Sequence, residues 1–188
     1  TPLTIIRGEG EVALRGQTKA VEEYRSTLAR IVEQADHTAR LVNDLLFIAR
    51  TDADQLRMDA QTLAFEDIVK STCADAQALG NDKGISIDFA SRVEGADVRG
   101  DPGRLRQLLH ILLDNATRYS EPKSSVAVTV EPSELGVALR VADRGRGIAE
   151  SDVQRVFERF YRGANASDRE GSGLGLTMAK AIVESHRG

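Results

Sequence analysis

One long amphipathic stretch in the first third of the chain constrains its fold more than any other feature. From residue 21 onward, apolar or small side chains recur at alternating spacings of three and four residues. They are Val21, Tyr24, Leu28, Ile31, Ala35, Thr38, Val42, Leu45 and Ala49. An a/d pattern held over about four heptads predicts a long helix that buries one stripe against partner helices.

A single helix of roughly 30 residues cannot bury this stripe by itself, so the pattern requires partners. Leu3, Ile6 and Leu14, with the turn-like segment 16–18 after them, predict a preceding antiparallel helix. Because two helices still leave an apolar seam, we expect a homodimer through the hairpin, with two helical hairpins forming a four-helix bundle.

The remainder of the chain mixes helical and strand patterns. Asp101 and Pro102 supply an N-cap and a first-turn proline for a leucine-rich helix that ends near Tyr119. Further helices are expected at residues 65–79, 152–160 and 174–185. Period-two alternation predicts strands at residues 85–89, 126–130 and 137–141, the last two as a hairpin. These elements indicate an α+β fold with helices on a largely antiparallel sheet.

A polar segment over residues 51–61 lies between the two parts of the chain. We place the domain boundary within it, with a helical hairpin over residues 1–57 and an α+β domain over residues 58–188. The polar segment would act as a hinge that lets the second domain swing towards the hairpin.

Composition narrows the classes of function. The net charge is −4 and the basic residues form no run, so we expect no nucleic-acid partner. No apolar run approaches the ~20 residues needed to span a bilayer. Cys73 is the only cysteine, which excludes an intrachain disulfide.

Three segments carry side chains that suit ligand binding. The first is residues 113–119, the C-terminal part of the predicted leucine-rich helix. It presents Asn115, Arg118 and Tyr119. The Asn115 amide oxygen is a hard neutral ligand that suits Mg²⁺, an ion usually shared between few protein oxygens and substrate phosphates. Arg118, one turn on, would neutralise phosphate charge. Taken alone, the segment also fits a helix cap at Asn115 and a solvated Arg118.

The second segment, residues 143–147, follows the predicted strand at 137–141. An ionised Asp143 carboxylate only accepts hydrogen bonds and an adenine amino group only donates them, so the two suit each other. Gly145 and Gly147 would let the backbone turn beneath a flat base. A plain turn is the alternative interpretation.

The third segment, residues 171–176, alternates Gly171, Gly173 and Gly175 and leads into the predicted helix at 174–185. Glycines allow a phosphate to approach the backbone closely, and a helix N-terminus favours negative charge. We expect either a phosphate-binding loop or a flexible hinge here. The small, polar stretch over residues 162–170 is expected to be a mobile lid over a ligand.

The order of these segments resembles the cytoplasmic core of the bacterial sensor histidine kinases of two-component systems. In that family a dimerising helical hairpin precedes an ATP-binding domain of the Bergerat (GHKL) type. The matching segments are 113–120 for the N box, 143–147 for G1, 157–162 for the F box and 171–176 for G2. The resemblance therefore implies a Bergerat-type α/β sandwich ATP-binding domain after the hairpin.

Carried over residue by residue, the resemblance implies a site for ATP and Mg²⁺. Asn115 would bind Mg²⁺, Asp143 would read adenine, and Arg118 with Tyr119 would line the nucleotide. The other implied ATP-binding residues are Gly145, Gly147, Phe160, Gly171, Gly173, Leu174, Gly175 and Leu176. Asn115 and Arg118 would also serve catalysis.

The first residues, Thr1-Pro2-Leu3, resemble the tail of the family's H box, His-Glu-Leu-Arg-Thr-Pro-Leu. This register places the phospho-accepting His before Thr1, so we expect that this chain alone cannot autophosphorylate. By the same register, Thr1 matches the Thr that family members use when they dephosphorylate their partner.

Two departures from the family pattern stand out. Ile111 occupies the position where many members have the first Asn of the N box, which removes one polar contact to the phosphates. The family's sheet also gains strands after its last helix. We therefore expect an ATP-binding domain that is truncated at its C-terminal strands.

The implied activity is that of a protein-histidine kinase. ATP would phosphorylate a His of the hairpin, and the phosphoryl group would pass to an Asp of a response regulator receiver domain, with a phosphatase reaction as a further option. The alternatives are a nucleotide-binding dimeric signalling module without autokinase activity and another GHKL ATPase. We expect a cytoplasmic fragment of a protein held in the bacterial inner membrane by other segments.

Overall fold

The computed structural model describes residues 2–15, 20–53, 58–80, 83–93, 95, 97–134, 136–163 and 171–188. They form two compact units, Thr1–Arg50 and Thr51–Gly188. The domain boundary at 57/58 stays a prediction, and residues 54–57 of the expected hinge lie outside the described residues. No helix in the described part of the chain is long and apolar enough to cross a membrane.

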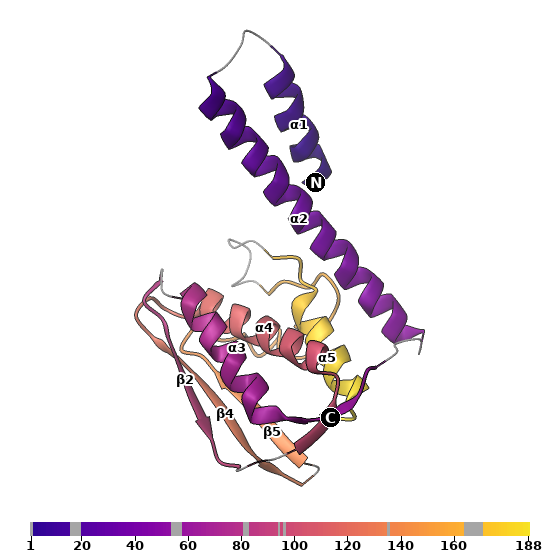
Figure 1. Ribbon diagram of the computed structural model, residues 1–188, viewed down its shortest axis with the longest axis vertical. Helices are drawn as coiled ribbons and strands as arrows, with labels where there is room; N and C mark the ends of the chain where they lie inside the picture. Colours follow the sequence, from indigo (N-terminus) through magenta and orange to yellow (C-terminus); the bar gives the residue numbers. More distant parts are fainter. Residues whose placement is uncertain are drawn as a thin grey trace. The chain divides into compact units, whose positions relative to one another are not determined.

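The first unit is the expected helical hairpin (Figure 1). It consists of α1 (Pro2–Leu14) and α2 (Val21–Asp52). An ion pair of 2.7 Å between Arg30 on α2 and Glu9 on α1 links the two helices. The turn predicted at residues 16–18 falls outside the described residues. The heptad pattern thus predicts both helices of the hairpin.

The second unit confirms the α+β class. Its elements are β1 (Gln61–Ala64), α3 (Phe65–Gly80), β2 (Ser86–Ser91), β3 (Asp97–Gly100), α4 (Pro102–Tyr119), β4 (Ser125–Ser133), β5 (Gly136–Ala142) and α5 (Gly175–Ser185). The expected order, a hairpin followed by an α/β domain, is therefore present.

The main sheet has the order β2-β4-β5, and β1 pairs with β3 in a separate two-stranded sheet. β4 and β5 form the predicted antiparallel hairpin, whereas β2 runs parallel to β4, with Ser86 opposite Ser125. Among the described strands, this parallel pair is the exception to the expected, largely antiparallel arrangement. The chain passes through β3 and α4 between β2 and β4, and such a helical crossover allows parallel pairing.

The short helix predicted over residues 152–160 is wrong, because this segment consists of successive turns. Two backbone hydrogen bonds span three residues there, from Arg155 N–H to the Asp152 carbonyl and from Glu158 N–H to the Arg155 carbonyl, both 2.8 Å. One bond spans four residues, from Val156 N–H to the Asp152 carbonyl at 2.9 Å, but the segment forms turns and not a regular helix.

The core of the second unit lies between the sheet and the helices on one of its faces, where α3 and α4 run side by side (Figure 1). α4 contributes Leu105, Leu108, Leu109, Leu113 and Ala116 to the buried residues. Leu109 is 0% exposed, and truncating such a side chain to alanine typically costs about 2–5 kcal/mol. This buried stripe fixes the rotation of α4 and therefore the direction in which its polar face points.

Candidate functional site

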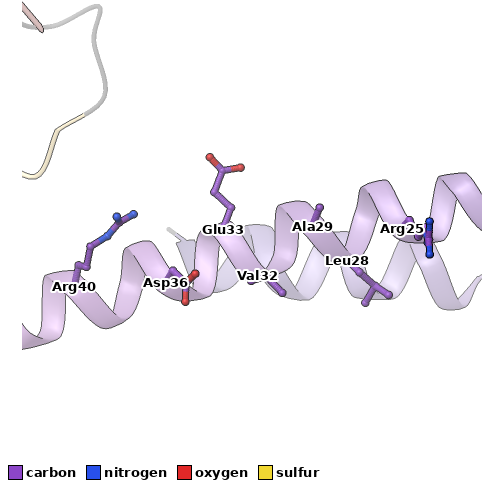
Figure 2. Close-up of a pocket in the computed structure, with 7 residues that line it drawn as sticks. All are labelled: Arg25, Leu28, Ala29, Val32, Glu33, Asp36 and Arg40. Atoms are coloured by element: carbon purple, nitrogen blue, oxygen red, sulfur yellow. The ribbon is translucent and has the colours of Figure 1, made fainter. Parts of the chain in front are cut away.

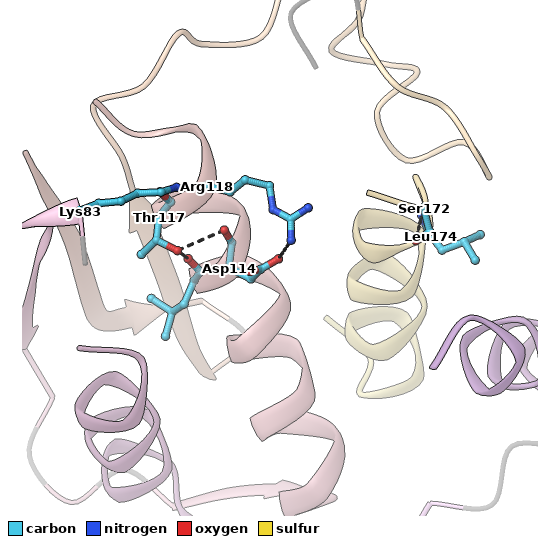
Figure 3. A network of polar contacts seen from close by, with 7 residues as sticks. Lys83, Asp114, Thr117, Arg118, Ser172 and Leu174 are labelled. Atoms are coloured by element: carbon cyan, nitrogen blue, oxygen red, sulfur yellow. Dashed lines mark hydrogen bonds and ion pairs between the residues drawn. The ribbon is translucent and has the colours of Figure 1, made fainter. Parts of the chain in front are cut away.

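Hydrogen bonds hold helix α4 at both of its ends. At its start, the Asp101 side chain accepts from Gly103 N–H (2.9 Å) and Arg104 N–H (3.1 Å). At its end, the Lys83 ammonium donates to the Thr117 carbonyl at 3.3 Å (Figure 3). The C-cap is Ser120, whose N–H donates to the Ala116 carbonyl. Asn115 is therefore not the helix cap, and its half-buried side chain stands within the helix.

Arg118 projects from α4 towards the start of α5. Its guanidinium pairs with the Asp114 carboxylate at 2.9 Å, as drawn in Figure 3. A Cβ added to Gly171 would meet the same guanidinium at 3.4 Å. Arg118 is thus oriented by an ion pair and lies beside the first glycine of the triplet, which contradicts a merely solvated side chain.

One face of α4 looks onto the glycine triplet. Residues 111, 115 and 118 lie on the same side of the helix, because positions three and four apart share a face. A Cβ on Gly175 would touch Ile111 at 3.4 Å, and Gly171 approaches Arg118. Asn115 lies between Ile111 and Arg118 on this face of α4, the one that segment 171–175 approaches.

Asp143 is joined to the same end of α4 through Gly145. Asp143 follows β5 directly, and its Oδ1 accepts from Gly145 N–H at 2.8 Å. Ser120 and Gly145 form an antiparallel bridge, and a Cβ on Gly145 would collide with the Tyr119 carbonyl oxygen. Only glycine allows this approach, which brings the exposed Asp143 carboxylate and the half-buried Tyr119 to one region.

The glycine triplet is tied to the preceding segment. Phe160 N–H donates to the Gly173 carbonyl at 3.0 Å, and the Thr177 hydroxyl donates to the Phe157 carbonyl at 2.9 Å. The Leu174 side chain is fully buried, so only its backbone can meet a ligand there. These ties favour a fixed binding loop over a free hinge.

The start of α5 has backbone donors without a side-chain cap. Leu174 occupies the N-cap position, and its side chain makes no capping hydrogen bond. Ser172, beside it in Figure 3, instead accepts from Leu174 N–H at 3.3 Å. The first N–H groups of a helix have no partner within it, so this terminus suits an anion.

Segment 149–163 carries the side chains of the predicted F box. The Arg155 guanidinium stacks over the Tyr161 ring, 4.2 Å from its centroid. A hydrogen bond to Asp152 raises the pKa of Tyr161, with burial adding to the rise and the charge of Arg155 opposing it. Phe160 is exposed and has a positive φ of 61°. These contacts give the segment a defined conformation despite its lack of regular secondary structure.

Parts of the expected site lie outside the described residues. They include Thr1 and residues 164–170 of the expected lid. Within the described ranges, no group of three or more His, Cys, Asp and Glu side chains is placed to hold a metal ion. Asn115 offers one amide oxygen on the face towards the glycines, which fits an ion coordinated mainly by phosphate and water.

The two left-handed glycines of the site provide a matched test of its packing. Gly173 and Gly147 have similar φ values of 70° and 66°. A Cβ on Gly173 would come within 2.7 Å of the Phe160 backbone, whereas one on Gly147 would meet nothing within 4 Å. Gly147→Ala should therefore lower the free energy of unfolding by only the backbone strain of about 1–2 kcal/mol, and Gly173→Ala should lower it by clearly more. Urea unfolding would measure both, and equal losses would contradict the packing of Gly173 on Phe160.

Comparison with known protein families gives two matches along the chain. Residues 1–54 match the family described as His Kinase A (phospho-acceptor) domain. Residues 100–188 match the family described as Histidine kinase-, DNA gyrase B-, and HSP90-like ATPase. The second match covers α4, the Asp143 loop and the glycine triplet, and it implies ATP binding.

Individual relatives agree with these matches over the whole chain. The chain is 32% identical to the sensor protein SrrB of Staphylococcus aureus over 193 residues, which is 32% of that protein. It is 34% identical to the sensor histidine kinase CusS of Escherichia coli O157:H7 over 190 residues, 39% of that protein. The chain thus spans about a third of the length of these relatives.

Solved structures show the same arrangement of elements. The histidine kinase AdeS of Acinetobacter baumannii superposes with a TM-score of 0.78 at 25% identity, covering 98% of this chain and 84% of that one. Full-length ShkA, solved in complex with AMPPNP, gives a TM-score of 0.76 at 26% identity and covers 98% of this chain and 41% of ShkA.

Proposed function

The chain belongs to the sensor histidine kinases of two-component systems, and on that premise we propose how its residues serve the kinase reaction. ATP with Mg²⁺ would bind at the polar end of α4. Its γ-phosphoryl group would pass to a His of the helical hairpin and from there to an Asp of a response regulator receiver domain. A parent protein in the inner membrane, with this chain on its cytoplasmic side, is part of the same proposal.

The observation that carries the proposal is the convergence of three segments far apart in sequence. Gly171 approaches Arg118 and Gly175 approaches Ile111 on the face of α4 that also carries Asn115, and Gly145 packs on the Tyr119 carbonyl. The residue that holds the metal, the residues that contact the phosphates and the residue that binds the base would thus line one site. The pair of ATP-binding and phospho-acceptor domains in one chain supports a kinase over another ATPase.

Each segment would take one part of the nucleotide. Asp143 would accept from the adenine amino group, with Gly145 and Gly147 beneath the base. Arg118 and the backbone amides of Gly171, Gly173 and Gly175 would bind the phosphates, and Asn115 would hold Mg²⁺. Tyr119, Phe160, Leu174 and Leu176 would complete the walls.

In phosphoryl transfer, the protein mainly positions the reacting groups and neutralises the charge of the phosphates. The bond between the γ-phosphorus and its bridging oxygen breaks, and a bond between that phosphorus and an imidazole nitrogen forms. ADP leaves with the bonding electron pair. In the second transfer, the phosphorus–nitrogen bond breaks and a carboxylate oxygen of the receiver Asp takes the phosphoryl group. Mg²⁺ bound at the phosphates would offset their negative charge.

The dimer is supported by the apolar side chains that the hairpin leaves exposed. No residue of α1 is buried, and Leu28 and Val32 on α2 are 59% and 57% exposed. These two line an open hollow along α2 together with Glu33, whose carboxylate points away from Leu28 in Figure 2. A second hairpin packed over Leu28 and Val32 would remove this apolar surface from water.

Light scattering is expected to give a mass of two chains of 20.4 kDa each at micromolar concentration. Val32→Lys should shift the mass towards one chain, because it places a charge in the apolar seam. Glu22→Lys, at an exposed position of α2 that does not line this hollow, should leave the dimer intact. A monomeric wild-type chain would contradict the proposed bundle.

The kinase activity is tested with γ-labelled ATP and a form of the protein extended before Thr1. We expect label on the protein that acid removes and base does not, as for phosphohistidine. Label that survives acid would indicate a hydroxyl ester instead, and absence of label from protein that binds ATP would support the signalling module without autokinase activity.

A further inference from the structure

His186, the residue that follows α5, makes two hydrogen bonds of opposite kind. Its Nδ1 lies 2.7 Å from the Ile182 carbonyl oxygen, and its Nε2 lies 3.0 Å from the Asp101 backbone nitrogen. A carbonyl only accepts and a backbone N–H only donates, so the neutral ring carries its proton on Nδ1. One bond stays within the end of α5, and the other crosses to the start of α4.

The imidazole of His186 lies against Gly100 and Asp101 at the start of α4. Asp101 is the N-cap of α4, and its second carboxylate oxygen also accepts from Asp59 N–H at 3.2 Å. A Cβ on Gly100 would come within 2.8 Å of the His186 ring. The half-buried imidazole of His186 therefore occupies space that a side chain at position 100 would fill.

The two helices joined by His186 carry opposite halves of the candidate site. α4 and α5 run antiparallel, because Asp101 at the start of α4 meets His186 beyond α5, whereas Gly171 before α5 meets Arg118 near the end of α4. Between these ends, Gly175 approaches Ile111. At about 1.5 Å per residue, the His186 contact lies roughly 25 Å along α4 from Arg118.

We propose that His186 is a positioning residue that sets the register of α5 against α4. It thereby fixes the spacing between the glycine triplet on one helix and Asn115 with Arg118 on the other. This inference rests on the proposed function, because that spacing matters only if the triphosphate lies between the two helices. A displacement near 1 Å in such a site can cost a large factor in function.

The test compares ATP and adenosine as ligands of the whole 188-residue chain. Adenosine would rely on Asp143, which is joined to α4 through Gly145 and not to α5. His186→Leu should weaken ATP binding about tenfold and adenosine binding less than about twofold. Isothermal titration would give both affinities, and circular dichroism would check that the fold is retained.

Two conservative variants separate the two hydrogen bonds of the ring. In His186→Gln, the amide oxygen can take the place of Nε2 and accept from Asp101 N–H, so ATP affinity should be close to that of the wild type. In His186→Asn, the shorter amide can replace only Nδ1, so the loss should match that of His186→Leu. Gly100→Ala would displace the ring without altering it, and its Cβ would also come within 2.9 Å of the buried Leu105. Where circular dichroism shows that this variant keeps its fold, its ATP affinity should fall selectively as well.

The outcomes are distinguishable. Unchanged ATP affinity in His186→Leu, equal losses for both ligands, or a Gln variant no better than the Asn variant would overturn the positioning role alone. A wild-type chain that binds neither ligand would overturn the proposed function and this inference together.

Discussion

Asn115→Ala is expected to abolish the Mg²⁺-dependent part of ATP binding and to slow phosphoryl transfer by at least about 100-fold. Asn115 lies on the face of α4 that it shares with Ile111 and Arg118, the two residues that Gly175 and Gly171 approach. Mg²⁺ uses few protein ligands in nucleotide sites, so the loss of one leaves the phosphate charge poorly offset.

Titrations of ATP with and without Mg²⁺ would measure the binding effect, and labelling of the form extended before Thr1 from γ-labelled ATP would measure the transfer. Asn115→Asp is the matched control, because it keeps an oxygen ligand in a side chain of nearly the same shape. The Asp variant should retain Mg²⁺ dependence. Undiminished labelling of the Ala variant would remove Asn115 from the metal site.

Asp143→Asn is expected to weaken ATP about 10- to 100-fold while leaving inorganic triphosphate binding nearly unchanged. A hydrogen bond to a charged group is worth about 1.5–3 kcal/mol, which corresponds to this range of affinity. The substitution preserves local structure, because an amide oxygen can still accept from Gly145 N–H as Oδ1 does now. The other carboxylate oxygen becomes an NH₂ group, which cannot accept from the adenine amino group.

The comparison of the two ligands makes this a test of base reading. A collapsed loop would lower the affinity for both ligands, since Gly145 also supports the end of α4 through Tyr119. An equal loss for ATP and triphosphate would therefore contradict the role of Asp143. Thermal unfolding near the wild-type temperature would confirm that the turn at Gly145 is kept.

Elements with a strong local signal could be predicted from the sequence. The heptads of α2 predict a long helix, the leucine stripe of α4 predicts a helix with one buried face, and Asp101-Pro102 marks the start of α4 correctly. β1 and β3 pair with each other and have four residues each. Strands of this length are too short to show a recognisable alternation of apolar and polar residues. In segment 152–160, helical spacing of apolar residues coexists with successive turns, and Phe160 at the end of the segment has a positive φ of 61°.

The identity of the site residues could be proposed from motifs, but their mutual placement could not. The approach of Gly145 to Tyr119 and that of Gly175 to Ile111 join segments more than twenty residues apart, and only the packed sheet and helices bring them together. His186 was no candidate in the sequence because a single His near a helix end carries no spacing signal. Its partner Asp101 is 85 residues away.

Titration of the 188-residue chain with ATP and Mg²⁺, followed through its backbone amide NMR signals, tests the central claim most directly. We expect saturable shifts concentrated at three places, the end of α4 around Asn115, the loop at 143–147 and the glycine segment 171–176. Omission of Mg²⁺ should reduce the shifts around Asn115 most. No saturable binding, or shifts confined to the hairpin of α1 and α2, would contradict an ATP site built from these segments.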